Sequence, residues 1–581
     1  MASLINKTKK GRQYTYWVES ARVKGKPRIV EQVYLGPRDR VLEEIKKAYT
    51  RGKTPGRCPL RQVQVKEFGA SAWLWHRASK LGLAEIVDRH VAPPPPRRRT
   101  PLSVGQYLSL AAVNRAVRAR SKRSLHDDWY QHSVVSRLCP ARPSDLSSQR
   151  FWDHMDQVGA EQIDAIQREL LGRLEKVFPP GAETLLYDTT NYYTFLDTFN
   201  QRADLARRGH NKQKRHDLRQ LSLALFLDEK RGLPLYHRCY RGDVPDVSAL
   251  EGSWQGLLQL WEKGLRRSPR QLTMVFDKGG SSRDNLKGLH RAGLHYVGAV
   301  PGRWTPDLLE VPLQEYRRLE LPGSKHVKAH RRRYRLWERE RTLVVVFSPS
   351  LYRRQRAAMN RVQAQVEERL WELAAAIERH RESGRGKGFT VASVARKIKA
   401  WTAAESLSEF LEAHWETEGS KVSRLLWSWE ADKKRALQRR LLGKTVLFTD
   451  RHDWETAQIV TSYRKLHRNE EVFRISKGRR GPWWPMFHWT DSKVRVHALY
   501  CHFALLLLCI LQSKLREAGF SISVDRCLDR LEKIQETRVI YANGSSERVL
   551  TEMDDLQRRL AAALGLLQIA EEVGNTVLND A

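Results

Sequence analysis

Three acidic residues, each at the end of an apolar run or inside a helical segment, are the side chains of this sequence best placed to do chemistry. Asp188 ends the apolar run "ETLLYD", Asp277 ends "LTMVFD", and Glu470 lies within "YRKLHRNEEVFRISK". Because they are far apart in the chain, only the fold can bring them together. Converging carboxylates can hold two divalent metal ions roughly 3.5–4 Å apart, which drives in-line attack on a phosphodiester. The trio therefore predicts metal-dependent cleavage of nucleic acid.

The surroundings of the two aspartates favour this interpretation without proving it. Asp188 is followed by the polar stretch "TTNYY", and Asp277 by the small residues "KGGSS", which allow a backbone or a phosphate to come close. An aspartate at the end of a strand is nevertheless common, and structural roles are the alternative. Five other aspartates compete for the same assignment: Asp197, Asp217, Asp246, Asp284 and Asp450.

The segment around Glu470 predicts one helix with a polar stripe. Tyr463, Glu470 and Lys477 are each seven residues apart, which is close to two helical turns, and Arg474 falls near the same stripe. We expect Lys477 and Arg474 to hold phosphates and Tyr463 to bond to or stack on the nucleic acid. The alternative is an amphipathic helix with solvent-exposed charge. A second, apolar stripe is expected to dock on a sheet: Ile459, Leu466 and Phe473.

The composition indicates a polyanionic partner. The 581 residues include 103 Lys and Arg against 66 Asp and Glu, a formal charge of +37 that is spread along the whole chain. Such a field favours nucleic acid, although it does not separate DNA from RNA, and a merely solvated basic surface is the alternative. A hydrophobic fraction of 41% is enough for packed cores.

Targeting signals and cysteine spacing point to a cytoplasmic protein. The start "MASLINKTKK" has no apolar signal region. The longest apolar run, residues 498–511, is shorter than a bilayer span, so we expect a buried helix there. The six cysteines form no CxxC pair, which predicts neither a zinc site nor a disulfide framework.

Two groups of basic residues are candidate contacts to a phosphate backbone. The first group is spaced three to four residues apart in a predicted helix after the "PPPPRRR" hinge, so its members can share one face. A solvated face is the alternative for them. The second group lies in a basic loop, residues 207–220. The candidates are Arg115, Arg118, Lys122 and Arg123 in the helix, and Lys212, Lys214 and Arg215 in the loop.

The length predicts three or more domains. Five short strand-like segments between residues 184 and 300, interrupted by a helical stretch, predict an α/β core. The predicted organisation is a β-rich region with a hairpin (1–65), a helical DNA-binding region (66–150), the core (151–300 and 443–520), a mixed insertion (301–442) and a helical tail (521–581).

On these residues the chain resembles the DDE transposases of bacterial insertion sequences, in particular the branch with a Tyr–Arg–Glu–Lys signature and an insertion in its core. The resemblance rests on "YDTTNYY" at Asp188, "VFDKGG" at Asp277, and the spacing of Tyr463, Glu470 and Lys477. It covers roughly residues 183–300 and 443–510. One departure is that the signature arginine falls on Leu466, which cannot bind phosphate; Arg464, Lys465 and Arg468 are possible substitutes.

The resemblance implies an RNase H-like core in which Asp188, Asp277 and Glu470 hold two Mg²⁺ ions, with Mn²⁺ as a possible substitute. It implies nicking at the terminal inverted repeats of a transposon and attack of the freed 3′-OH on target DNA. A homodimer in the synaptic complex and a place in the bacterial cytoplasm, at the nucleoid, are expected with it. The alternatives are a metal-dependent nuclease without strand transfer, a non-catalytic DNA-binding relative and an RNA-binding scaffold.

Overall fold

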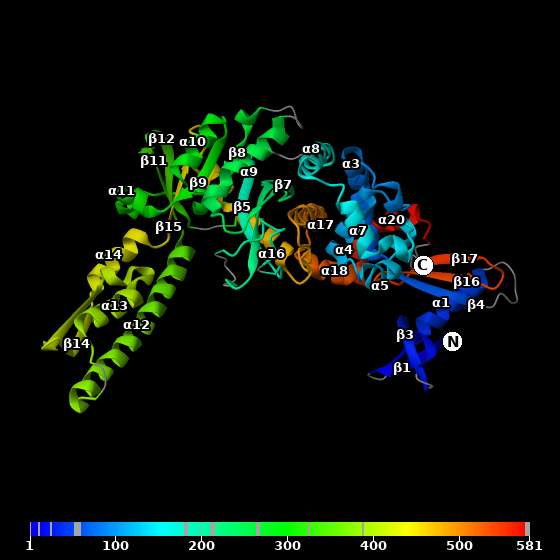
Figure 1. Ribbon diagram of the computed structural model, residues 1–581, viewed down its shortest axis with the longest axis horizontal. Helices are drawn as coiled ribbons and strands as arrows, with labels where there is room; N and C mark the ends of the chain where they lie inside the picture. Colours follow the sequence, from blue (N-terminus) through cyan, green and yellow to red (C-terminus); the bar gives the residue numbers. More distant parts are fainter. Residues whose placement is uncertain are drawn as a thin grey trace.

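The chain forms an elongated arch with a mixed α/β composition (Figure 1). A large sheet lies in one half, a helical body in the other, an insertion extends from one end, and a small amino-terminal sheet lies at the opposite end. The computed structural model describes residues 2–9, 12–23, 26–51, 60–178, 184–197, 199–209, 215–262, 268–323, 326–385 and 388–575.

The large sheet has nine strands in the order β10-β11-β12-β15-β9-β8-β5-β6-β7. Their bounds are β5 (Thr184–Thr194), β6 (Arg219–Asp228), β7 (Pro234–Arg241), β8 (Thr273–Val275), β9 (His295–Val300), β10 (Arg317–Arg318), β11 (Lys328–Leu336), β12 (Arg339–Phe347) and β15 (Lys444–Thr449). The strands β5, β6 and β7 pair antiparallel, whereas β8 is parallel to both β5 and β9. The five strand segments predicted between residues 184 and 300 are thereby confirmed.

Burial explains why these segments are strands. Every residue of β6, "RQLSLALFLD", is buried, because neighbouring strands flank it on both sides and helices cover the sheet. The helix α9 (Asp246–Leu260) packs on β6 and β7, and α10 (Arg283–Arg291) packs on β9. The helices α15 (Thr456–Arg464) and α16 (His467–Lys477) also pack on this sheet, α15 on β9 and β15 and α16 on β5.

The insertion is smaller than the sequence predicts. Residues 301–347 contribute β10, β11 and β12 to the large sheet, where β12 pairs antiparallel with β15. The part with a hydrophobic core of its own begins at Pro349 and extends away from the sheet. It contains α12 (Pro349–Ser383), α13 (Val391–Thr402), β13 (Leu411–Glu418), β14 (Lys421–Trp429) and α14 (Ala431–Leu441). Cross-strand pairing, which the sequence does not reveal, decides this boundary.

The helical body covers residues 66–150, the region predicted to be helical, and continues to Val177, into residues predicted as the start of the core. It contains α2 (Gly69–Leu81), α3 (Leu83–His90), α4 (Val104–Arg118), α5 (Leu125–Asp128), α6 (Val135–Leu138), α7 (Ser148–Met155) and α8 (Ala160–Val177). Helices α2 and α3 are separate because Gly82 adopts the left-handed region at φ 71° and ends α2.

The longest apolar segment is the central helix of this body. Helix α17 (Asp491–Glu517) is long and apolar enough to cross a membrane by length and composition, but 94% of its apolar window is buried inside the protein. It contacts α4 and α8 in the helical body and β7 in the large sheet. The prediction of a buried helix here is confirmed, and this helix joins the two halves of the arch.

Both ends of the chain contribute small sheets. The first is β1 (Ala2–Lys9), β2 (Arg12–Val23) and β3 (Lys26–Pro37), followed by α1 (Arg38–Arg51). The second joins β4 (Leu60–Glu67) to β16 (Gln535–Tyr541) and β17 (Ser546–Leu550). The prediction of a helical tail is therefore only partly right, because two strands lie between the helices α18 (Val524–Leu531), α19 (Asp555–Leu564) and α20 (Leu566–Glu572). Those strands are stabilised by a partner strand more than 460 residues away.

Candidate active site

Asp188 lies within β5, and Asp277 lies two residues beyond the end of β8, the parallel strand beside β5. In the pairing of β5 with β8, Leu186 lies opposite Val275. Asp188 is two residues after Leu186, and Asp277 is two residues after Val275. Side chains two residues apart in extended backbone point to the same side, so both aspartates are expected at the same level and on the same side of the sheet. Neighbouring strands are about 4.8 Å apart. The structure thus brings together two carboxylates that are 89 residues apart in sequence.

Backbone amides fix both side chains locally. The amide of Thr189 donates to Asp188 Oδ1 at 2.7 Å, and the amide of Gly279 donates to Asp277 Oδ1 at 2.8 Å. Asp277 is exposed and Asp188 half-buried. Asp188 does not end its strand, as the sequence suggested. The strand β5 continues to Thr194 because β6 pairs with it throughout, whereas the pairing with β8 stops at Val275.

The helix predicted around Glu470 is interrupted. Helix α15 ends at Arg464 and α16 starts at His467, with Lys465 and Leu466 in a turn between them. The turn keeps the phase of the buried face, because Ser462, Asn469 and Ser476, each seven residues apart, are buried on both sides of it. The predicted apolar stripe packs against the core, with Ile459 fully buried and Leu466 and Phe473 partly buried. The side chains of α16 that are buried are Asn469, Val472 and Ser476. Leu466 and Phe473 are only half-buried.

Two anchors fix α16 along β5. At one end, Arg468 donates to the carbonyl of Glu229 in the turn between β6 and β7, and Lys465 Nζ lies 3.2 Å from Glu229 Oε1. At the other end, the hydroxyls of Ser476 and Tyr192 are 2.7 Å apart. Lys465 and Arg468, two of the three possible substitutes for the missing signature arginine, are therefore engaged with the β6–β7 turn; Arg464 is half-buried.

These anchors place Glu470 beside the aspartates along the strand direction. Glu470 is six residues before Ser476, about 9 Å along a helix. Asp188 is four residues before Tyr192, about 13 Å along a strand and on the same strand face. The start of α16 lies near the start of β5, and its end lies near the end of β5, so the helix and the strand run in the same direction. Measured back from the contact between Ser476 and Tyr192, the positions of Glu470 and Asp188 along the strand axis therefore differ by only a few ångströms. Glu470 itself is exposed.

The other members of the predicted polar stripe lie around the same region. Burial, and secondarily the negative charge of Asp277, raise the pKa of Tyr463 to about 12, so its phenol lies close to that carboxylate. The ammonium of Lys477 lies 5.1 Å from the centre of the Tyr192 ring. Arg474 is exposed on the outer side of α16. Tyr463 is thus related to Asp277 and Lys477 to Tyr192, and their predicted contacts with nucleic acid stay a prediction.

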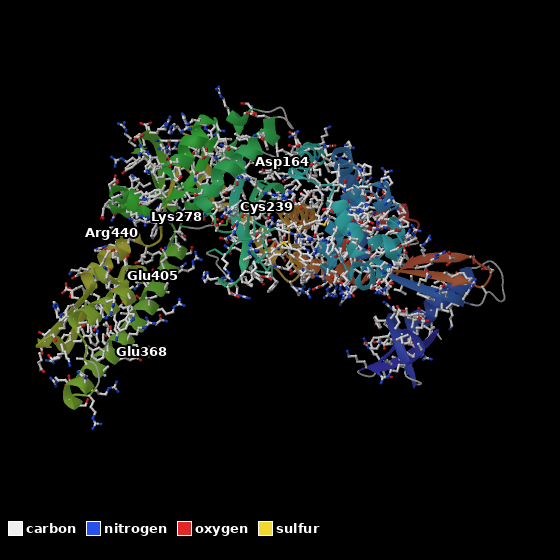
Figure 2. The ribbon with its side chains drawn as sticks, viewed as in Figure 1. Asp164, Cys239, Lys278, Glu368, Glu405 and Arg440 are labelled. Carbon is white, nitrogen blue, oxygen red and sulfur yellow. The ribbon has the colours of Figure 1, made fainter. Side chains whose placement is uncertain are left out.

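The fit of this arrangement to a metal ion is incomplete. In the parts of the chain that the structure describes, no three His, Cys, Asp or Glu side chains lie close enough together to hold a metal ion. The two aspartates are suitably placed as a pair of oxygen ligands. Glu470 has to approach them by a change of rotamer or a shift of α16 before three carboxylates can share ions. In the view of Figure 2, Lys278, which follows Asp277, lies between Cys239 of β7 and Arg440 at the base of the insertion.

The structure also gives the surroundings of the five competing aspartates. Four of them have local partners in hydrogen bonds: Asp197 with the amide of Phe199, Asp217 with Arg215, Asp246 with Tyr240, and Asp450 with His295 and the amide of Tyr296. The fifth, Asp284, lies in the first turn of α10. Asp188 and Asp277 accept backbone amides in the same way, so these contacts describe the competitors without excluding them.

The predicted phosphate-binding face of the helix after the hinge is wrong. Helix α4 ends at Arg118, so Lys122 and Arg123 lie beyond it. Arg115 is buried and donates to the carbonyls of Pro482 and Pro485 at 3.3 and 2.8 Å. Lys122 Nζ donates to the hydroxyl of Tyr500 at 2.7 Å, and burial together with Arg115 lowers its pKa well below the usual range. Arg118 and Arg123 are exposed. Packing against α17 and the preceding loop, which the sequence cannot anticipate, turns two of the four inward.

The basic loop is only partly described. Lys212 and Lys214 lie outside the described residues. Arg215 pairs with Asp217 at 2.8 Å, and its guanidinium lies 5.8 Å from the centre of the Tyr193 ring. Arg215 therefore lies beside β5, beyond Asp188 in the strand direction.

Sequence reasoning missed an aromatic cluster that joins β5 to the loop after α16. Tyr192 stacks on Trp483 with ring centres 4.2 Å apart, and Tyr193 lies against Trp484 at 4.9 Å. The indole of Trp484 donates to the carbonyl of Tyr193 at 3.1 Å. The doubled aromatics in "NYY" and "PWWP" are the signal that could have indicated this contact. The cluster positions the end of α16 relative to Asp188.

Comparisons with known proteins place transposases among the structural neighbours. No family model matches the chain, and no curated protein matches it. A synaptic complex of piggyBac transposase with hairpin DNA is similar over 90% of this chain and 89% of that chain, at 11% identity and a TM-score of 0.30. A Mos1 transposase paired-end complex with the left transposon end and a pre-cleavage Mos1 transpososome are each similar over 37% of this chain and 63% of those chains, at 12% identity and a TM-score of 0.15.

Proposed function

We propose that this protein is a DNA transposase that cleaves DNA at transposon ends and joins the freed 3′-OH to target DNA. The observation that carries the proposal is the position of Asp188 within β5 and of Asp277 just beyond β8, the parallel strand beside it, with the helix of Glu470 anchored along β5. Acids repel DNA unless a cation offsets them, so three acids on neighbouring elements of a chain of charge +37 need a chemical reason.

Each residue has a separate task in the proposed reaction. Asp188, Asp277 and Glu470 would hold two Mg²⁺ ions, which Mn²⁺ can replace. When bound, two such ions activate the attacking oxygen and stabilise the leaving oxygen. Lys477 and Arg474 would contact phosphates as cations, and Tyr463 would orient the substrate beside Asp277. Closure of α16 toward the aspartates would accompany loading, because the three carboxylates are not yet gathered.

The finer parts of the proposal have separate support. The strand order β7-β6-β5-β8-β9, with two antiparallel and then two parallel pairings, supports an RNase H-like core. The spacing of Tyr463, Glu470 and Lys477, together with the insertion before them, supports the insertion-sequence branch with a Tyr–Arg–Glu–Lys signature. A homodimer that pairs two transposon ends, in the bacterial cytoplasm, follows from that assignment.

The deciding experiment is cleavage of DNA that contains the flanking ends of the gene, with Mg²⁺ or Mn²⁺. The full-length protein is compared with Asp188→Asn, Asp277→Asn and Glu470→Gln. Asp284→Asn, an exposed aspartate on α10, is the matched control. We expect metal-dependent nicks at the repeat boundary that are lost in the three variants and kept in the control. Cleavage by all three variants at the level of the control would remove the trio from the active site.

Metal binding can be tested without activity. Fe²⁺ with peroxide cuts a polypeptide beside the bound ion, so we expect chain breaks near residues 188 and 277 that Mg²⁺ suppresses. The Asp188→Asn variant should lose these breaks, and Asp284→Asn should keep them. Breaks elsewhere in the chain, with the two aspartates untouched, would move the site.

A metal-dependent nuclease without strand transfer is the second candidate, because the same acids would serve it. The two are separated by supplying pre-cut ends with free 3′-OH groups and a supercoiled target. Joined products support the transposase, whereas cuts without joined products support the nuclease. Specific binding of ends without cutting or joining would support a non-catalytic DNA-binding relative.

A further inference from the structure

Four exposed aromatic side chains lie in two segments near the far end of β5, the strand that carries Asp188. Large apolar side chains are usually withdrawn from water, yet Phe195, Phe199, Phe487 and Trp489 are 65%, 87%, 63% and 60% exposed. In the described part of the chain only one further Phe or Trp is so exposed, Trp371 of the insertion. The four belong to two short segments, residues 195–199 after β5 and 487–489 before α17.

Hydrogen bonds hold these two segments together, although almost 290 residues separate them. The side chain of Asn200 donates to the carbonyl of Trp489 at 2.9 Å, and the amide of Asp491 donates to the carbonyl of Arg202 at 3.2 Å. The amide of Leu205 donates to Asp491 Oδ1 at 2.9 Å. The exposed rings therefore lie on one built surface, which we call the aromatic platform: Phe195, Phe199, Phe487 and Trp489.

A layer of packed aromatics supports the platform from below. Phe195 contacts the ring of Tyr193 edge-on at 5.7 Å, and Tyr193 lies against Trp484 at 4.9 Å. The guanidinium of Arg219 donates to the carbonyls of Asp197 and Asn200 at 2.9 and 2.8 Å, next to Phe195 and Phe199 in the chain. The rings are thus exposed beside hydrogen-bonded backbone, which limits the conformational entropy lost when a planar ligand stacks on them.

The charge around the platform matches a polyanion. In sequence, residues 195–219 and 474–493 carry 12 Lys and Arg against 4 Asp and Glu. Residues 210–214 lie outside the described structure, and Arg479, Arg480 and Lys493 pair with Asp529, Glu532 and Asp156. The four acids are all engaged: Asp197 and Asp491 accept backbone amides, while Asp204 and Asp217 pair with arginines. A protein partner seated on this surface would have to be strongly acidic, whereas nucleic acid brings both negative charge and planar bases.

We propose that the aromatic platform binds unpaired bases of the DNA substrate by stacking. Base–aromatic stacking needs only a ring face and an adjacent cation for the phosphates, and it works for any base. The platform begins directly after β5, the strand of Asp188, so a strand leaving the candidate active site can reach it. The inference rests on the proposed function only in taking DNA as the ligand; it concerns binding and needs no cleavage.

The test is DNA binding by the full-length protein in EDTA, which prevents metal-dependent cleavage. The probes are a fluorescent 30-nucleotide thymidine strand, the same strand with abasic sites in its middle third, and a 30-base-pair duplex. The protein is compared with the fourfold variant Phe195→Ala, Phe199→Ala, Phe487→Ala and Trp489→Ala. Trp371→Ala is the matched control, because its ring is equally exposed but lies outside the platform.

We expect the unmodified protein and the Trp371→Ala control to bind the thymidine strand more tightly than the abasic strand, on the order of tenfold for each ring that stacks. The fourfold variant should bind both strands alike, with duplex affinity changed by less than about threefold, because its phosphate contacts remain. If the fourfold variant does not fold, the double variant Phe487→Ala and Trp489→Ala carries the same comparison.

Two results would overturn the proposal. In one, the fourfold variant keeps the full preference for the thymidine strand over the abasic strand. In the other, the variant loses self-association by sedimentation while its dependence on bases is unchanged, which would make the platform an interface between two copies of this chain. Failure of the cleavage assay leaves this comparison intact, so the two proposals fail separately.

Discussion

Two buried histidines should make the junction between the large sheet and the helical body sensitive to acid. His237 of β7 and His502 of α17 face each other with ring centres 4.6 Å apart. Neither ring nitrogen of His502 has a hydrogen-bond partner in the described chain, nor does Nδ1 of His237. Burial lowers the pKa of His502 to about 3, and burial with the neighbouring His502 lowers the pKa of His237 well below its usual value.

The sign and size of the effect follow from linkage. Both rings are neutral in the folded protein, whereas in the unfolded chain they take up protons near pH 6.5. The unfolded state therefore binds more protons, and stability falls as the pH drops below about 6.5. Between pH 7 and pH 5.5 one such histidine costs about 1.2 kcal/mol, so the pair costs about 2.5 kcal/mol. For His502 the loss continues toward pH 3.

The perturbation is His502→Leu, which replaces the unpartnered ring by an apolar side chain in an apolar core. We expect the loss of stability between pH 7 and pH 5.5 to shrink by about 1.2 kcal/mol, with stability at pH 7 changed little. Hydrogen exchange of the α17 amides, corrected for the intrinsic rate at each pH, reports the free energy of opening of this helix. His290→Leu, an exposed histidine on α10, is the control and should keep the pH dependence of the unmodified protein. An unchanged pH dependence in His502→Leu would refute the reasoning.

Four further outcomes are expected. Binding to transposon-end DNA should weaken on the order of 10³-fold between 50 and 200 mM salt if about six phosphates are neutralised; a flat response in a salt titration would contradict an electrostatic footprint. Arg115→Ala should destabilise the protein by about 3 kcal/mol, because two buried carbonyls lose a charged donor, while the exposed Arg118→Ala should change thermal stability by less than about 0.5 kcal/mol; equal effects would place Arg115 at the surface. Lys477→Ala should weaken DNA binding but leave Fe²⁺-directed chain breaks unchanged, whereas Glu470→Gln should do the reverse. Replacing residues 349–442 by a three-residue Gly–Ser linker should leave a folded remainder by circular dichroism and limited proteolysis, because the amide of Ser348 already bonds to the carbonyl of Gly443 at 2.9 Å; an aggregated product would show that the insertion supports the sheet.

Much of the core could be predicted because its signals are local. The five strand segments between residues 184 and 300 are short apolar runs bounded by turns. Apolar runs of that length form buried strands when other elements cover both faces of their sheet. The apolar stretch in α17 likewise requires burial in any fold without a membrane. For the candidate site, the chemistry of Asp188, Asp277 and Glu470 could be named from residue type and position alone.

The insertion boundary, the tail and the basic helix could not be predicted, because distant partners decide them. Strand β12 joins the large sheet only by pairing with β15, and β16 forms only because β4 lies beside it. Arg115 has the sequence signature of a phosphate contact, but packing against the loop at Pro482 turns it inward. At the start of α16, just after the break from α15, Arg468 bonds to the carbonyl of Glu229. Glu229 is more than 200 residues away in sequence, so the periodic pattern of the helix cannot reveal this contact.

The sequence by itself determined the strongly basic character, the α/β core and the acids that could carry chemistry, since these depend on composition and short-range hydrophobic pattern. Only the tertiary structure decided that Asp277 follows the parallel strand beside the one that carries Asp188, that competing aspartates have hydrogen-bond partners, and that four aromatic rings from two distant segments share one exposed surface. The physical reason is that strand register and the hydrogen bonds between loops are long-range interactions, whose energy depends on residues hundreds of positions apart.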